Sequence, residues 1–83
     1  MSRWVLEKRD HTNPNKWRKI KEGDDLEALV WESTLPPERL RILDMKAMSI
    51  RSVAVLRKSE DWRAWMFRCN SIVNKREGKG GAA

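Results

Sequence analysis

The number and length of the helices in this chain depend most on residues 37–58, which read PERLRILDMKAMSIRSVAVLRK. Apolar residues recur there at spacings of three and four, which is the repeat of one face of a helix. That face consists of Leu40, Leu43, Ala47, Ile50 and Ala54. A second apolar set lies on the other side of the same helical wheel and consists of Ile42, Met45, Val53 and Leu56. A helix that is apolar on two faces is packed on both sides or is broken.

We therefore predict a helix over residues 37–48 that either continues to residue 57 or breaks near residues 49–52. The second face of an unbroken helix would need a dimer interface, because a chain this short has little else to cover it. A break would give a helix–turn–helix arrangement. Residues 50–58 would then be a recognition helix that carries Arg51, Arg57 and Lys58.

Capping signals predict two further helices. Residues 25–33 are expected to form one, with Asp24 as its cap, Glu27 at capping-box spacing and Pro36 beyond its end. Residues 60–75 are expected to form the other, which begins after Ser59. Its apolar stripe consists of Trp62, Trp65, Met66, Cys69, Ile72 and Val73. The predicted core is Leu26, Leu29, Val30, Leu40, Leu43, Ala47, Ile50, Ala54, Trp62, Trp65, Met66, Cys69 and Ile72.

The N-terminal part of the chain has a different pattern. Two short basic segments, residues 3–9 and 16–21, flank an Asn-Pro-Asn sequence at residues 13–15, which favours a tight turn. Residues 3–21 are therefore predicted to form a basic β-hairpin, with a flexible basic arm as the alternative. The fold class expected is α+β or mainly α: this hairpin or arm followed by three to four short helices over residues 24–75. Residues 1–77 make one small domain, and residues 78–83 a flexible Gly-rich tail.

Composition excludes several classes of protein. The chain has 83 residues, a net charge of +6, five Trp, one Cys and one His. A single Cys excludes a disulfide framework and a Cys-based zinc site. No apolar run is long enough to span a membrane, and no signal peptide is recognisable, so a cytoplasmic location is expected.

Catalytic chemistry is not indicated. His11 lies in the expected turn and Cys69 on the expected core stripe, so neither has a partner that would make it a general base or a nucleophile. The paired acids of the chain fall where helix N-termini favour them. We expect a protein that is not an enzyme and has no metal, no cofactor and no small-molecule substrate.

Charge is distributed unevenly along the chain. Residues 1–22 contain seven Lys or Arg and three acids, whereas residues 23–48 contain three Lys or Arg and six acids. A basic segment that contains Trp can neutralise phosphates and stack on a base. The predicted nucleic-acid-binding residues are Lys8, Arg9, Lys16, Trp17, Arg18, Lys19 and Lys21. The sequence thus predicts a regulatory or accessory protein that binds DNA or RNA, of a kind common among phage and mobile-element products.

A protein partner is the alternative. Trp, Phe and Arg are enriched at protein–protein interfaces, where a few such residues contribute most of the binding energy. The predicted protein interface is Trp62, Arg63, Trp65, Phe67 and Arg68. Such a surface would suit a homo-oligomeric structural protein of the virion type, or a small inhibitor that docks on a host protein complex through an acidic surface.

Overall fold

Four strands and three α-helices make up residues 2–33 and 35–76, the part of the chain that the computed structural model describes. The strands are β1 (Trp4–Arg9), β2 (Trp17–Gly23), β3 (Leu40–Asp44) and β4 (Ser49–Ser52). The α-helices are α1 (Leu26–Val30), α2 (Val53–Arg57) and α3 (Asp61–Arg76). Two 3₁₀ turns, η1 (Pro37–Arg39) and η2 (Lys58–Glu60), precede β3 and α3.

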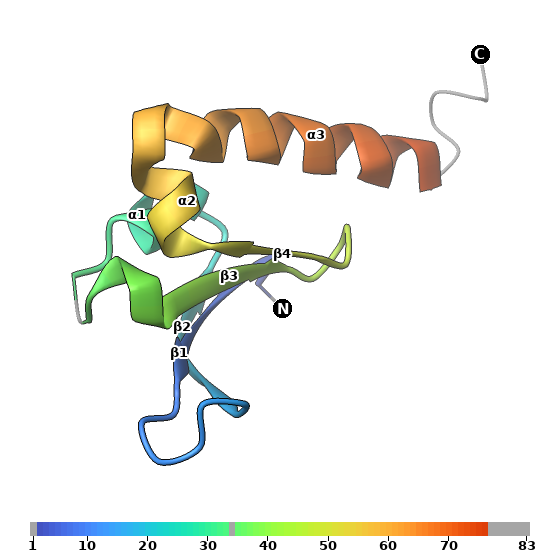
Figure 1. Ribbon diagram of the computed structural model, residues 1–83. Coiled ribbons are helices and arrows are strands. Elements are labelled where there is room, and N and C mark those ends of the chain that lie inside the picture. The colour runs from blue at the N-terminus through green and yellow to red at the C-terminus, as the bar shows by residue number, and fades with distance from the viewer. Residues whose placement is uncertain (1, 34, 77–83) are drawn as a thin grey trace.

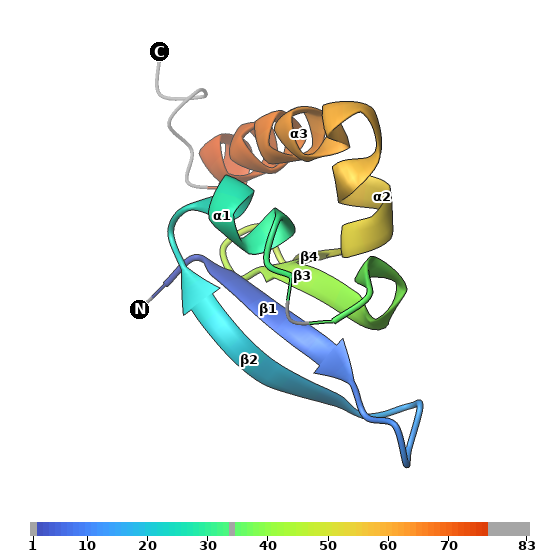
Figure 2. The same ribbon diagram turned by 90° about the vertical axis from the view of Figure 1, so that its left-hand side faces the viewer.

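The strands form one antiparallel sheet in the order β2-β1-β3-β4. All three α-helices lie on the same face of this sheet (Figure 1, Figure 2). The fold is therefore a two-layer α+β arrangement. No helix of the described residues covers the second face of the sheet, which we call the open face.

The predicted helix over residues 37–48 is wrong, and so is its continuation to residue 57. Side chains of β3 alternate between the two faces: Leu40, Ile42 and Asp44 are buried toward the helices, and the residues between them are not. The Asp44 carboxylate then accepts the N–H groups of Lys46 and Ala47 at 2.9 and 3.0 Å, which turns the chain back into β4. The apolar spacing of three and four is thus produced by a strand, a turn and a second strand.

This sheet overturns the predicted fold class. Residues 40–52 form a β-hairpin, so the predicted row of three to four helices over residues 24–75 is wrong: this part of the chain contains β3 and β4, one long helix (α3) and two helices of five residues each (α1 and α2). The helix–turn–helix and the two-faced helix are both wrong for the same reason. Residues 50–58 contain the end of β4 and helix α2 rather than a recognition helix. Arg57 is used internally, because its guanidinium donates to the carbonyl of Val30, the last residue of α1, and to that of Glu32.

Residues 3–21 form a hairpin and not an arm. β1 pairs with β2 from Trp4↔Gly23 to Arg9↔Trp17, with a bulge where Leu6 meets Glu7. β1 also pairs with β3, so the hairpin is continuous with the rest of the sheet. β2 reaches Gly23, two residues beyond the predicted end of the hairpin.

The two flanking helices exist with shifted ends. α1 is shorter than the predicted 25–33, and its N-cap is Asp25, which accepts the N–H of Ala28. Asp24 instead accepts the N–H of Arg3. α3 follows the prediction of 60–75 closely, but Ser59 does not cap it. Ser59 has a φ of 52° inside η2, which bends the chain between α2 and α3.

The core lies between the sheet and the helices. Leu6, Leu40 and Ile42 of the sheet pack with apolar residues of all three helices, and burial of each such side chain contributes about 1.5–3 kcal/mol. The predicted core is partly wrong. Ile50 and Ile72 are 56% and 44% exposed. Leu43, Ala54 and Met66 are only half-buried. Trp4 and Leu6 belong to the core instead. The predicted tail over residues 78–83 lies outside the described residues.

Candidate functional site

The β1–β2 hairpin extends past the third strand. β3 pairs with β1 only from Trp4 to Lys8, so Arg9 and residues 10–16 project beyond it, away from the helices (Figure 1). The turn falls at residues 14–15, within the Asn-Pro-Asn sequence. The loop is held by its own contacts, since Asp10 accepts the N–H and hydroxyl of Thr12 at 2.8 and 2.7 Å. Residues 11–16 are all exposed and form a defined tip.

The hairpin brings the seven predicted nucleic-acid-binding residues together but divides them between its two faces. Residues that pair directly across an antiparallel ladder share a face. The helix-facing side carries Lys8, Arg18 and Lys21. The open side carries Arg9, Trp17 and Lys19. Lys16 lies in the tip between the strands. The sequence suggested one patch in which Trp17 lies among all the cations. The structure has two patches, one on each face of the hairpin.

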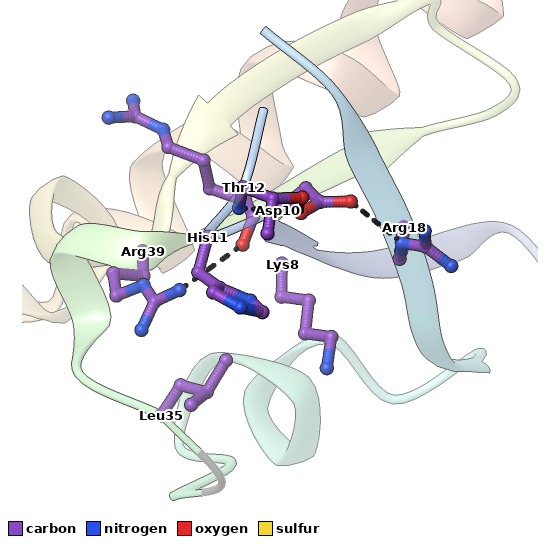
Figure 3. A pocket seen from close by; sticks show the side chains of 8 residues that line it. Lys8, Asp10, His11, Thr12, Arg18, Leu35 and Arg39 are labelled. Carbon is purple, nitrogen blue, oxygen red and sulfur yellow. Dashed lines mark hydrogen bonds and ion pairs between the residues drawn. The ribbon is translucent and has the colours of Figure 1, made fainter. Parts of the chain in front are cut away.

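The helix-facing side contains a pocket of about 470 Å³ between the hairpin and residues 35–39. Figure 3 shows Lys8, His11 and Arg39 around this space, with Leu35 at its other side. Arg39 also donates to the carbonyl of Arg9 at 3.5 Å, which ties η1 to the end of β1. The pocket thus collects cationic side chains from both strands of the hairpin and from η1.

Asp10 supplies the carboxylate among the residues that line this pocket, and it already accepts hydrogen bonds from Thr12 and Arg18. Hydrogen bonds from the side chain and N–H of Thr12, and then from Arg18 at 3.0 Å, hold the pKa of Asp10 well below its usual range. Asp10 therefore stays ionised and neutralises Arg18. The other cations of the pocket, Lys8 and Arg39, have no carboxylate partner within the described residues, and neither does Arg9, whose guanidinium lies on the open side against Trp17.

Trp17 lies on the open face between two arginines. The guanidinium carbons of Arg41 and Arg9 lie 4.2 and 5.2 Å from the centre of its ring. Arg41 is anchored by Glu7, whose Oε1 accepts its Nε and Nη2 at 2.8 and 2.7 Å. A hollow of about 270 Å³ opens beside the ring and reaches Ile50 of β4. Aromatic, aliphatic and cationic groups therefore meet at one end of the open face.

Sequence reasoning missed Arg39, Arg41 and Ile50 as members of this region. All three come from residues 37–52, which were expected to be helical with a possible break near residues 49–52. The pairing of β3 with β1 places Arg41 opposite Glu7, and η1 brings Arg39 to Arg9. The alternation of Leu40, Arg41 and Ile42 was the available signal, but it is short.

The predicted protein interface on α3 is only partly on the surface. Trp62 and Trp65 are 7% and 3% exposed and belong to the core. The indole N–H of Trp65 donates to Ser49 at 3.2 Å, and its ring lies 5.4 Å from that of Trp4. The exposed members of the set are Arg63, Phe67 and Arg68.

A partly buried polar cluster joins the sheet to α3. Arg3 donates to both carboxylate oxygens of Asp44, at 3.1 and 2.8 Å, and also to Asn70 of α3. Burial raises the pKa of the neighbouring Cys69 thiol to about 11, with the Asp44 charge acting in the same direction. The protonated thiol is a poor nucleophile. The described residues contain no group of three His, Cys, Asp or Glu that could hold a metal ion.

Comparison of the chain with protein-family models, with curated proteins and with solved structures finds no match. Among the described residues, no helix is both long enough and apolar enough to cross a bilayer.

Proposed function

We propose that this chain is a non-enzymatic nucleic-acid-binding protein of a regulatory or accessory kind, and that the end of its β1–β2 hairpin binds phosphate groups. One observation carries the proposal. Four cations gather at this end of the sheet without a carboxylate partner among the described residues: Lys8, Arg9, Lys16 and Arg39. Cations that have no carboxylate partner within the described residues are available to an external polyanion.

The acids of the hairpin leave this excess of positive charge intact. Asp10 pairs with Arg18, Glu7 with Arg41, and Glu22 with Lys19 at 3.6 Å. Each acid is thus matched by one cation, and the four unpaired cations remain. Phosphates bound by such cations release condensed counterions, which makes the affinity fall steeply as salt is added.

The test measures this salt dependence. Affinity for a labelled oligonucleotide is read by fluorescence anisotropy between about 50 and about 200 mM salt. For duplex DNA, each lost phosphate contact reduces the slope of log affinity against log salt by about 0.9. The double variant Lys8→Ala, Lys16→Ala is expected to reduce the slope by nearly twice that amount. A variant with an unchanged slope would contradict the proposal.

The control removes the same charge elsewhere. Lys58 in η2 and Lys75 in α3 are exposed and make no ion pair with the described residues. The double variant Lys58→Ala, Lys75→Ala is expected to keep the wild-type slope. Equal losses in the two double variants would mean that net charge alone attracts the nucleic acid, and the hairpin would then not be the site.

A protein partner is the second candidate function. Phe67 is 75% exposed on α3, and Arg63 and Arg68 are exposed on the same helix. An aromatic residue accompanied by arginine is typical of residues that dominate protein interfaces. This surface would serve self-association or docking on another protein.

A further inference from the structure

The hollow beside Trp17 combines groups that recognise a nucleobase and a phosphate. An unpaired base stacks well on a Trp ring or on a guanidinium plane, and a guanidinium also neutralises the adjoining phosphate. Trp17, Arg41 and Arg9 provide both kinds of group within one hollow of about 270 Å³. The three α-helices lie on the opposite side of the sheet, so they do not cover this hollow (Figure 1).

The two arginines are held differently. Arg41 makes two contacts with Glu7, and both side chains are mostly buried, so its guanidinium is fixed against the Trp17 ring. Arg9 is exposed and has no carboxylate partner among the described residues. Arg9 can therefore leave the ring and follow a phosphate, whereas Arg41 stays in place as part of the stacking surface.

We infer that the open face binds single-stranded nucleic acid, with one unpaired base stacked at Trp17 and its phosphate bound by Arg9. This inference rests on the proposed function and adds the type of nucleic acid to it. The bases of a duplex have both faces covered by their neighbours, so a duplex cannot use Trp17 in this way. Single-stranded DNA and RNA share the stacking and phosphate chemistry.

The position of the helix-facing pocket suits a ligand that is flexible enough to contact both hollows. Both hollows lie at the same end of the sheet, because Arg9 lines both, Arg39 lines the first, and Glu38 and Leu40 line the second. They lie on opposite faces of the sheet. A single strand is flexible enough to bend around this end of the sheet and reach both hollows, whereas a DNA duplex is stiff over the dimensions of so small a protein.

The experiment compares three ligands and three variants. The ligands are a labelled DNA strand of about 15 nucleotides, the RNA strand of the same sequence, and the corresponding DNA duplex. Wild type is compared with Trp17→Ala, with Trp17→Phe and with Trp31→Ala. Trp31 is the matched control, because it is 51% exposed and has the Arg57 guanidinium carbon 5.5 Å from its ring centre, but it lies at the end of α1 on the helix side.

Wild type is expected to bind a single strand more tightly than the duplex. Trp17→Ala should weaken single-strand binding by about tenfold or more and leave duplex binding unchanged. Trp17→Phe should restore most of the loss, and Trp31→Ala should have no effect. Preference for the DNA or the RNA strand identifies the natural ligand.

Four results would overturn the inference. In the first, Trp17→Ala binds single strands as tightly as wild type does. In the second, Trp17→Ala loses single-strand and duplex binding equally. Either result would mean that Trp17 stacks on no base. If the protein binds none of the three ligands, the proposed function is overturned as well. Duplex binding with normal salt dependence but no single-strand preference would overturn the inference and leave the proposed function intact.

A second measurement does not depend on the folding of Trp17→Ala. Trp4, Trp62 and Trp65 are no more than 7% exposed, so in Trp31→Phe the remaining accessible indole is Trp17. Addition of the single strand should quench the fluorescence of this variant over the same concentration range as the anisotropy change. Binding without quenching would contradict stacking at Trp17.

Discussion

Asp44 joins three parts of the molecule through its carboxylate. It is 1% exposed, pairs with Arg3 and accepts the N–H groups of Lys46 and Ala47. Removal of Asp44 leaves the partly buried Arg3 guanidinium without its counter-charge and two turn N–H groups without their acceptor, which costs about 3–5 kcal/mol. Asp44→Ala is therefore expected to lower the free energy of unfolding by that amount in urea titration. Asp24→Ala is the control: Asp24 accepts the exposed N–H of the same Arg3, so its loss should cost about 1 kcal/mol or less. Similar losses in the two variants would show that the buried pair is unimportant.

Protonation of two aspartates links stability to pH. Burial opposes ionisation of Asp44, but the hydrogen bonds from Arg3 and from the turn prevail and keep its pKa below the ordinary value. The pKa of Asp10 is also lowered, chiefly by Thr12. The unfolded chain therefore binds protons at a higher pH than the folded protein does, so stability present above about pH 4 is lost as the pH falls further. Urea midpoints measured from about pH 6 down to about pH 2 test this. Asp44→Asn should flatten the decline, and an equally steep decline would contradict the assignment to Asp44.

Among the elements, the N-terminal hairpin and α3 could be predicted from sequence and the β3–β4 hairpin could not. Asn-Pro-Asn marks the first turn, and the apolar stripe of α3 repeats from Trp62 to Val73, about three turns of a 16-residue helix. β3 has only five residues, and the turn that follows it contains no Gly, Pro or Asn. Its geometry comes from the Asp44 carboxylate, a contact that the local sequence pattern does not reveal. Half of the candidate site was therefore predictable, namely the hairpin cations and Trp17, whereas Arg39 and Arg41 depend on the placement of β3.

The turn between β3 and β4 predicts a stabilising substitution. Met48 has a φ of 54°, which is unfavourable for a side chain with a Cβ, and its side chain is 74% exposed. Met48→Gly should relieve this strain with little loss of packing and raise the free energy of unfolding by about 0.5–1 kcal/mol. Met45→Gly in the same turn is the control. Met45 does not have a positive φ, so its replacement by Gly should lower the free energy of unfolding. Thermal unfolding of both variants decides the matter, and a lower melting temperature for Met48→Gly than for wild type would contradict the prediction.

On the scale of the whole molecule, the one-sided placement of the helices separates two surfaces. The hairpin end and the open face carry the unpaired cations and Trp17, whereas α3 carries Phe67 on the other side of the sheet (Figure 1). The two candidate functions therefore use different surfaces and can be tested independently.

Phe67→Ser is expected to leave oligonucleotide affinity within about twofold of wild type, because surface changes away from a binding site have small effects. The same variant removes the exposed aromatic group of α3, so sedimentation of wild type and variant over a range of concentrations reports whether α3 mediates self-association. A wild type that dimerises and a variant that does not would assign α3 to a homo-oligomer interface. Loss of oligonucleotide binding in Phe67→Ser, with Trp17→Ala unaffected, would transfer the nucleic-acid site from the sheet to α3 and contradict the proposal. Because Phe67 is 75% exposed, its replacement by Ser removes little packing, so a change in either readout reflects the surface and not the fold.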